Sequence, residues 1–264
     1  MSRGISKVLC LPGYLQSGAT FAKKSSGLRK ALTKQLGVEL DYIDPCQTIE
    51  SQSELGFPLA ATEEESKNVW NSIVESGNNR RWFEHQGPSK NAGLDDSIQY
   101  IIDHINNNGP YDGIIGFSQG AAMAIMVTNS LQRMLPAHPP LKIGLFISGF
   151  CLTKPSDGNF SSENKERIAE ITDLEQYKPE VVFSSDAEKY LKIDDDKGFD
   201  TDVILVYGEN DSIVPAIRSK YVSTLYPASK VHFVPHDGAH YVPNQKPFVR
   251  KIVELFDQKV NEKL

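Results

Sequence analysis

The chain has 264 residues and a formal net charge of −6, with 39% hydrophobic and 23% charged residues. These proportions are typical of a globular protein, and no stretch approaches the roughly 20 apolar residues that a membrane helix needs. No dense run of lysine and arginine offsets the negative charge, so we expect neither stable membrane insertion nor a nucleic-acid partner. The length fits a single domain over residues 1–264, with the oligomeric state left open.

Short apolar runs alternate with helical patterns along most of the chain. Taken in chain order, the expected elements are strand 8–11, helix 19–36, strand 38–43, helix 62–75, helix 94–107, strand 112–116, helix 119–133, strand 142–147, strand 203–207, helix 216–225, strand 230–234 and helix 246–260. Such alternation is typical of βαβ units. It predicts an α/β fold with a mostly parallel, doubly wound sheet flanked by helices.

Two segments interrupt this alternation. Residues 44–91 contain three prolines and only one plausible helix, and residues 149–200 are charged and lack long periodicity. We expect both to be irregular insertions outside the sheet, near the active site, with the second forming a partial cap. Insertions of this kind often carry binding residues.

The strongest motif is Gly116-Phe117-Ser118-Gln119-Gly120, a G-x-S-x-G placed between an expected strand and an expected helix. In a nucleophile elbow the serine occupies a strained turn from strand to helix, and small residues two positions away let the backbone pass. The helix N-terminus behind Ser118 would favour a developing oxyanion. The alternative interpretation is a simple turn of small residues.

A serine nucleophile needs a base and an acid, which in this arrangement follow in the order Ser, Asp or Glu, His. Asp211 follows the strand 203–207, and Glu209 is the second choice of acid. Asp211 is also explicable as a solvated turn or helix-capping residue. His240 follows the strand 230–234 and a glycine turn, whereas His236 lies closer to the strand and is expected to be structural. We therefore predict a triad of Ser118, Asp211 and His240.

The oxyanion hole of such a site uses the N–H after the nucleophile and a second N–H from the loop after the first core strand. Here these are the N–H groups of Gln119 and Tyr14, since Gly13 lets the backbone turn inward before Tyr14. The alternative is a plain Pro-Gly turn at the end of the strand.

No metal or cofactor is expected. The two histidines four residues apart, His236 and His240, are separated by a glycine and preceded by a proline, which break the helix that a zincin-type pair requires. The chain has three widely spaced cysteines, Cys10, Cys46 and Cys151. Their spacing indicates neither a zinc site nor a disulfide framework. We expect a cytoplasmic location, because a reducing cytosol is the default for this cysteine pattern. The C-terminal Glu262-Lys263-Leu264 resembles a peroxisomal address but has Glu in place of its small residue.

Apolar residues near the expected cleft offer two interpretations: they line an acyl channel or they fill minor cores. The candidates for substrate binding are Leu15, Phe57, Trp82, Phe83 and Phe150, with Trp70 and Phe160 as further aromatic residues of the two insertions. An apolar channel would favour medium or longer acyl esters over charged ones.

Several segments together resemble the fungal FSH family of serine hydrolases, which is related to a human ovarian tumour-associated hydrolase. They are residues 9–18, residues 116–122, Ile147-Ser148-Gly149-Phe150, Gly208-Glu209-Asn210-Asp211 and His236-Asp237-Gly238-Ala239-His240. The resemblance implies an α/β-hydrolase fold, the triad Ser118, Asp211 and His240, and carboxylesterase activity. Relatives commonly have histidine at the position of Pro12, so the shape of the oxyanion loop stays open.

The residues and the resemblance together predict a carboxylesterase that acts on a small-molecule ester with an apolar acyl chain, through an acyl-enzyme, and needs no cofactor. An acyl-protein or acyl-CoA thioesterase would use the same triad and is the first alternative. A binding protein that has lost catalysis on a hydrolase fold is the second.

Overall fold

The structure is a computed structural model that describes residues 5–87, 90–193 and 199–260. Its centre is a six-stranded sheet in the order β12-β11-β8-β7-β1-β2, and every neighbouring pair is parallel. The strands are β1 (Lys7–Leu11), β2 (Glu39–Tyr42), β7 (Gly113–Phe117), β8 (Ile143–Ile147), β11 (Asp202–Gly208) and β12 (Val231–His236). The predicted α/β class with a parallel sheet is confirmed.

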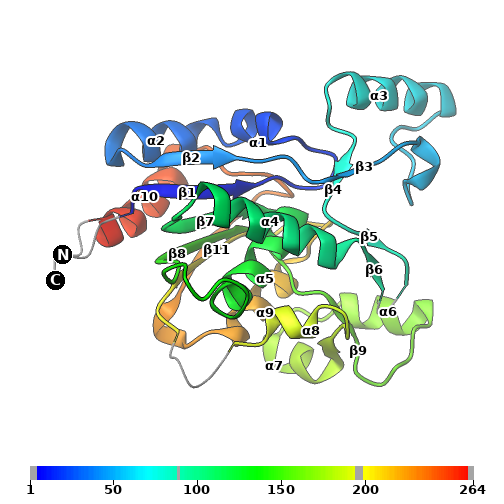
Figure 1. Cartoon of the computed structure of the whole chain (residues 1–264). Helices are drawn as coiled ribbons and strands as arrows, with labels where there is room; N and C mark the ends of the chain where they lie inside the picture. Colours follow the sequence, from blue (N-terminus) through cyan, green and yellow to red (C-terminus); the bar gives the residue numbers. More distant parts are fainter. Residues whose placement is uncertain (1–4, 88–89, 194–198, 261–264) are drawn as a thin grey trace.

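Helices cover both faces of the sheet (Figure 1). One layer consists of α1 (Gly18–Lys24), α2 (Ser26–Leu36) and α10 (Lys246–Val260). The other consists of α4 (Leu94–Asn108), α5 (Gln119–Met134) and α9 (Ala216–Val222), after which come the 3₁₀ turns η4 (Ser223–Leu225) and η5 (Ala228–Lys230). Each layer encloses its own apolar core against the sheet.

The inner strands are apolar on both faces because both faces are covered. In β1, Val8 and Cys10 belong to the core under α1, α2 and α10, whereas Leu9 and Leu11 belong to the core under α4, α5 and α9. A strand with two buried faces shows no alternation of apolar and polar residues. This explains why these strands appear in the sequence as short continuous apolar runs.

The helix predicted over residues 19–36 is two helices, and that prediction was wrong in this detail. The break lies at Ser25, whose side chain donates a hydrogen bond to the carbonyl of Phe21 at 2.8 Å. A serine bonded back to the preceding turn competes with helix continuation. The chain restarts at once as α2 and ends at Gly37, which adopts the left-handed conformation expected of a helix-ending glycine (φ 68°).

The two insertions contain more regular structure than expected. The first holds β3 (Gln47–Thr48), η1 (Gln52–Glu54), α3 (Glu63–Glu75), β4 (Arg80–Arg81), β5 (Glu84–His85) and β6 (Asn91–Ala92). The second holds β9 (Thr153–Pro155), α6 (Ser162–Ala169), α7 (Leu174–Tyr177), η2 (Lys178–Glu180), β10 (Val181–Phe183) and α8 (Glu188–Leu191). Four of their short strands pair with segments distant in sequence, β3 with β4 and β9 with β10, which a local pattern does not reveal.

The order of the strands determines where a ligand can bind. From β1 the chain goes to β2 on one side and then returns to β7 on the other side of β1. At such a switch point the loops after the two central strands diverge and leave a crevice at the carboxyl ends of the strands. Both insertions follow carboxyl ends of strands, β2 and β8, and Figure 1 shows them at the same end of the molecule. The C-terminal Glu262-Lys263-Leu264 lies outside the described residues.

Candidate active site

Ser118 lies at the switch point, on the turn between β7 and α5. Its backbone has φ 54° and ψ −119°, a conformation that L-residues rarely adopt, and its N–H donates to the Ile147 carbonyl at 2.9 Å. The flanking glycines are sterically required. A Cβ added to Gly116 would lie 2.4 Å from the Gly120 carbonyl oxygen, and a Cβ added to Gly120 would lie 2.2 Å from the Pro12 carbonyl oxygen. The motif has the geometry of a nucleophile elbow.

Three side chains from three separate loops meet at this point. The His240 Nε2 atom lies 3.0 Å from the Ser118 hydroxyl oxygen, and its Nδ1 atom lies 2.7 Å from an Asp211 carboxylate oxygen. The Asp211 side chain is completely shielded from solvent and that of His240 is 13% exposed. The His240 ring also packs against the Phe117 ring, with centroids 4.9 Å apart. This arrangement can pass a proton from the hydroxyl to an imidazole held in one orientation.

Asp211 is held as a carboxylate. One oxygen accepts the backbone N–H groups of Ile213 at 2.9 Å and Val214 at 2.8 Å, and the other accepts the Ser148 hydroxyl at 3.1 Å. Burial raises the pKa of this carboxyl, but the hydrogen bonds from His240 and from the two N–H groups outweigh it and keep the pKa below its usual value. The acid therefore stays ionised at neutral pH.

The structure distinguishes Asp211 and His240 from the alternative acid and the alternative histidine. Glu209, the second candidate acid, forms an ion pair with Lys220 at 3.5 Å instead of contacting His240. His236 is buried between the rings of Tyr241 and Phe248, and its Nδ1 atom accepts the N–H of Gly238 at 3.2 Å. His236 thus has a packing role, in line with the sequence interpretation. Across the described residues no group of three His, Cys, Asp or Glu side chains could hold a metal ion.

The loop after β1 lies against the elbow. A Cβ on Gly13 would be 3.3 Å from the Ser118 Cβ atom, so the backbone of this loop passes directly beside the nucleophile. The N–H of Leu15 donates to the Arg80 carbonyl at 2.9 Å and is already used, and Leu15 has a positive φ of 53°. Tyr14 precedes it on the same turn. Gln119 opens α5, where the first N–H groups have no partner within the helix.

Sequence reasoning missed a set of buried contacts that hold the loop after β1. The Gln119 side chain accepts the Trp82 N–H at 2.8 Å and donates to the Phe83 carbonyl at 2.9 Å. The Trp82 indole N–H donates to the Pro12 carbonyl at 2.8 Å. The first insertion therefore holds both the start of α5 and the loop after β1. The sequence contains no signal for this, because the partners lie far apart along the chain.

Three of the candidates for substrate binding lie in the main apolar core. Trp82 and Phe83 are 0% exposed and Phe150 is 6% exposed, which agrees with the second of the two interpretations, residues that fill a core. The insertions fold back against α4, α5 and α9, and their aromatic side chains are buried in the interface with these helices. Leu15 is half-buried beside the small apolar cluster of the first insertion, and Phe57 is 51% exposed with its ring 6.3 Å from that of Tyr14.

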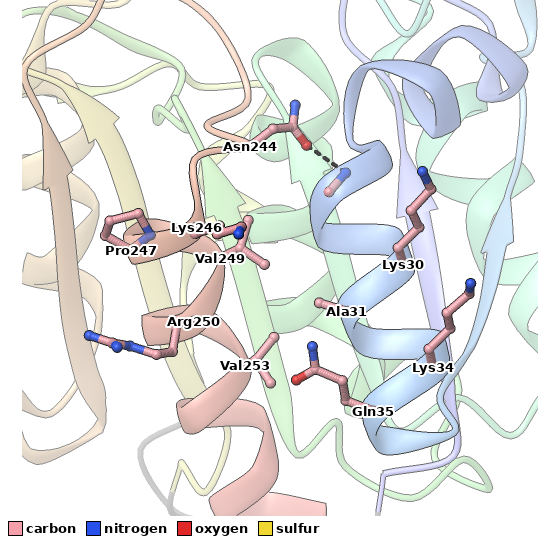
Figure 2. Close-up of a pocket in the computed structure, with 11 residues that line it drawn as sticks. Lys30, Ala31, Lys34, Gln35, Asn244, Lys246, Pro247, Val249, Arg250 and Val253 are labelled. Carbon is pink, nitrogen blue, oxygen red and sulfur yellow. Dashed lines mark hydrogen bonds between the residues drawn. The ribbon is translucent and has the colours of Figure 1, made fainter.

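Two cavities differ in their position relative to the site. The larger, about 660 Å³, opens between α2 and α10 (Figure 2), where Ala31 and Val253 lie between cationic side chains, and none of its lining residues is Ser118, Asp211 or His240. The smaller, about 420 Å³, begins beside the acid, since Ser212 and Ile213 line it, and extends under the second insertion. No helix in the described part of the chain is long and apolar enough to cross a membrane.

Comparisons with known proteins agree with this geometry. The family profile described as serine hydrolase (FSH1) matches residues 1–252. The chain is 31% identical to family of serine hydrolases 3 of Saccharomyces cerevisiae, over 93% of this chain and 81% of that protein. It is 26% identical to the human esterase OVCA2, over 96% of each chain.

Solved structures at lower identity show the same fold. The crystal structure of SOBER1 from Arabidopsis thaliana has a TM-score of 0.55 at 14% identity, over 97% of this chain and 99% of that one. Acyl-protein thioesterase 2 from Zea mays has a TM-score of 0.53 at 15% identity, over 98% of this chain and 96% of that one. The predicted α/β-hydrolase fold is thereby confirmed. Because the profile covers nearly the whole chain and a relative above 30% identity does the same, this chain belongs to the FSH1 family of serine hydrolases.

Proposed function

We propose that the protein hydrolyses carboxylic esters of small molecules through an acyl-enzyme formed on Ser118. The observation that carries this proposal is the continuous hydrogen-bonded chain from the Ser118 hydroxyl through His240 to Asp211. In the first half-reaction the Ser118 oxygen attacks the acyl carbon while its proton passes to His240 Nε2. Asp211 keeps the other imidazole proton on Nδ1 and stabilises the positive charge that develops on the ring.

The second half of the mechanism returns the enzyme to its starting state. The protonated His240 gives its proton to the departing alcohol. A water molecule, deprotonated by the same imidazole, then attacks the acyl-enzyme, and the imidazole returns that proton to the Ser118 oxygen as the acid is released. We assign the N–H groups of Gln119 and Tyr14 to the oxyanion that forms in both steps. Each such donor is typically worth about 10² to 10³ in rate. No bound cofactor takes part in this sequence of steps.

The surroundings of the site support an acyl group with apolar character. Ile213, two residues after the acid, is 67% exposed, and Phe57 is 51% exposed next to the loop of Tyr14. Exposed apolar side chains at the entrance of a site are typical of a surface that receives an apolar ligand. The human relative is named an esterase.

The cysteines are unpaired, which supports a cytoplasmic location.

A fluorophosphonate probe tests the nucleophile directly. We expect the wild-type protein to be labelled once and the Ser118→Ala variant not to be labelled, because only an activated serine reacts. The Ser72→Ala variant, altered at an exposed serine of α3, is the matched control and should label like the wild type. Labelling that persists in Ser118→Ala would remove this serine from the mechanism. Parallel assays with an ester and a thioester of the same acyl chain then measure which bond is preferred.

A further inference from the structure

Arg218 is a partly buried cation with no acidic partner among the described residues. It lies on α9, and its guanidinium is stacked over the Phe150 ring, 4.3 Å from the centroid. The groups that act on its charge are the Tyr177 hydroxyl, the Cys151 thiol and the His85 ring, and no acidic side chain of the described chain is among them. Burial lowers the pKa of the guanidinium. Arginine nevertheless stays charged in proteins, so a desolvated charge remains uncompensated here.

The same residue lines the 420 Å³ cavity beside the acid loop. Buried apolar side chains form much of the wall, among them Ile168, Val181 and Ile217. The charged residues of the wall are Lys154, Lys165 and Arg218, and none is acidic. An apolar cavity with cations and no carboxylate is complementary to an apolar chain that carries a negative charge.

The cavity is also adjacent to the loop that carries the proposed acid, although Ser118, Asp211 and His240 do not line it. Ser212 and Ile213 line it and follow Asp211 directly in the chain. The hydroxyl of Ser219, the residue after Arg218, donates to the Gly149 carbonyl at 2.7 Å. Gly149 in turn lies against the first turn of α5, since an added Cβ would be 3.3 Å from that of Ala121. The guanidinium is therefore held at the same edge of the sheet as the elbow.

We propose that this cavity, called here the Arg218 pocket, binds the acyl chain of an ester whose far end is a carboxylate, with Arg218 as the residue that recognises the charge. The proposal rests on the proposed esterase function and names its substrate class. The planar guanidinium can donate two parallel hydrogen bonds to a carboxylate. Binding would compensate the buried charge, and the apolar wall would hold the methylene chain.

Matched pairs of esters provide the test. The 4-nitrophenyl monoesters of adipic, suberic and sebacic acid are compared with the 4-nitrophenyl esters of hexanoic, octanoic and decanoic acid, which have the same chain lengths and no terminal charge. At the chain length that fits best, we expect kcat/KM of the wild type to favour the carboxylate-bearing ester. Arg218→Met should reduce kcat/KM for that ester by about tenfold to a hundredfold, the range for hydrogen bonds between charged groups, and leave its uncharged counterpart nearly unchanged.

Two further variants separate recognition from structure. Arg218→Lys keeps the charge but loses the planar fork, so it should retain part of the preference. Arg250→Met removes a cation from α10 whose side chain is 78% exposed, and it should behave like the wild type with both esters. A wild-type enzyme that shows no preference for the charged ester at any chain length would overturn the proposal. So would a preference that survives in Arg218→Met.

Direct binding keeps this proposal distinguishable from the esterase function. The Ser118→Ala protein is titrated with octanoate and with octanamide, which have the same chain and differ in charge. We expect octanoate to bind more tightly and Arg218→Met in that background to abolish the difference. Equal binding of the two probes refutes the Arg218 pocket even if ester hydrolysis is observed. Selective binding of octanoate supports the pocket even if no ester is hydrolysed.

Discussion

Replacing Gly120 by alanine would place a methyl carbon in space that the end of β1 already occupies. The added Cβ would lie 2.2 Å from the Pro12 carbonyl oxygen and 2.3 Å from the Leu11 carbonyl oxygen, whereas ordinary contacts begin at 3.4 Å. Both neighbours are backbone atoms, so no side chain can rotate away. The loop after β1 and the start of α5 must therefore separate by roughly 1 Å.

That separation has two consequences of different size. Overpacking in a close-packed region typically costs about 1 to 3 kcal/mol of the free energy of unfolding. The displaced loop carries Tyr14, whose N–H we assign to the oxyanion, and a misplacement of about 1 Å in an active site can cost about 10² in rate. We thus expect Gly120→Ala to fold, to lose about 1 to 3 kcal/mol of stability and to lose about 10² in kcat/KM.

The assay measures urea unfolding and ester hydrolysis on the same preparation. Gly56→Ala is the matched control, because no atom lies within 4 Å of the Cβ that it adds. We expect this control to match the wild type in both measurements. Normal turnover by a folded Gly120→Ala protein would show that the contact between the elbow and the loop after β1 does not set the geometry of the oxyanion hole.

Two other predictions concern charge and protonation. Asp211→Asn should lower kcat by about 10⁴ without unfolding the protein, because the amide no longer holds the productive imidazole tautomer. The control Glu209→Gln should stay near the wild-type rate. Equal losses in the two variants would mean that the acid is misassigned. His138 accepts the Tyr111 N–H at 3.0 Å through Nε2 and contacts the Pro139 carbonyl at 2.6 Å through Nδ1, so protonation of Nε2 breaks the first bond. Burial lowers the pKa of His138, although its hydrogen bond to Pro139 raises it. The unfolded chain therefore binds this proton more readily, and the free energy of unfolding should fall as the pH drops below about 6.5. Urea midpoints at neutral and mildly acidic pH should show a smaller fall in His138→Gln, and an unchanged fall would exclude this histidine as the cause.

Much of the architecture could be predicted because it depends on local patterns. The four inner strands β1, β7, β8 and β11 are short apolar runs. The major helices have periodic apolar residues, as Ile98, Ile101, Ile102 and Ile105 show in α4. Ser118 could be located because an elbow needs small residues two positions away on either side. Asp211 and His240 could be proposed because the carboxyl ends of parallel strands lie at one edge of a sheet. Their position after successive strands was enough to bring them near the serine.

The remaining features depend on contacts between residues that are distant in sequence, and no local pattern encodes them. From the sequence, Trp82 and Phe83 could line an acyl channel or fill a minor core, and they are 0% exposed in the main core because the insertion packs against α4 and α5. The sequence analysis used only the backbone N–H of Gln119, yet its side chain accepts a hydrogen bond from Trp82, 37 residues away. The uncompensated charge of Arg218 has the same origin. Whether a charge is compensated depends on which segments pack around it, and only the tertiary structure decides that.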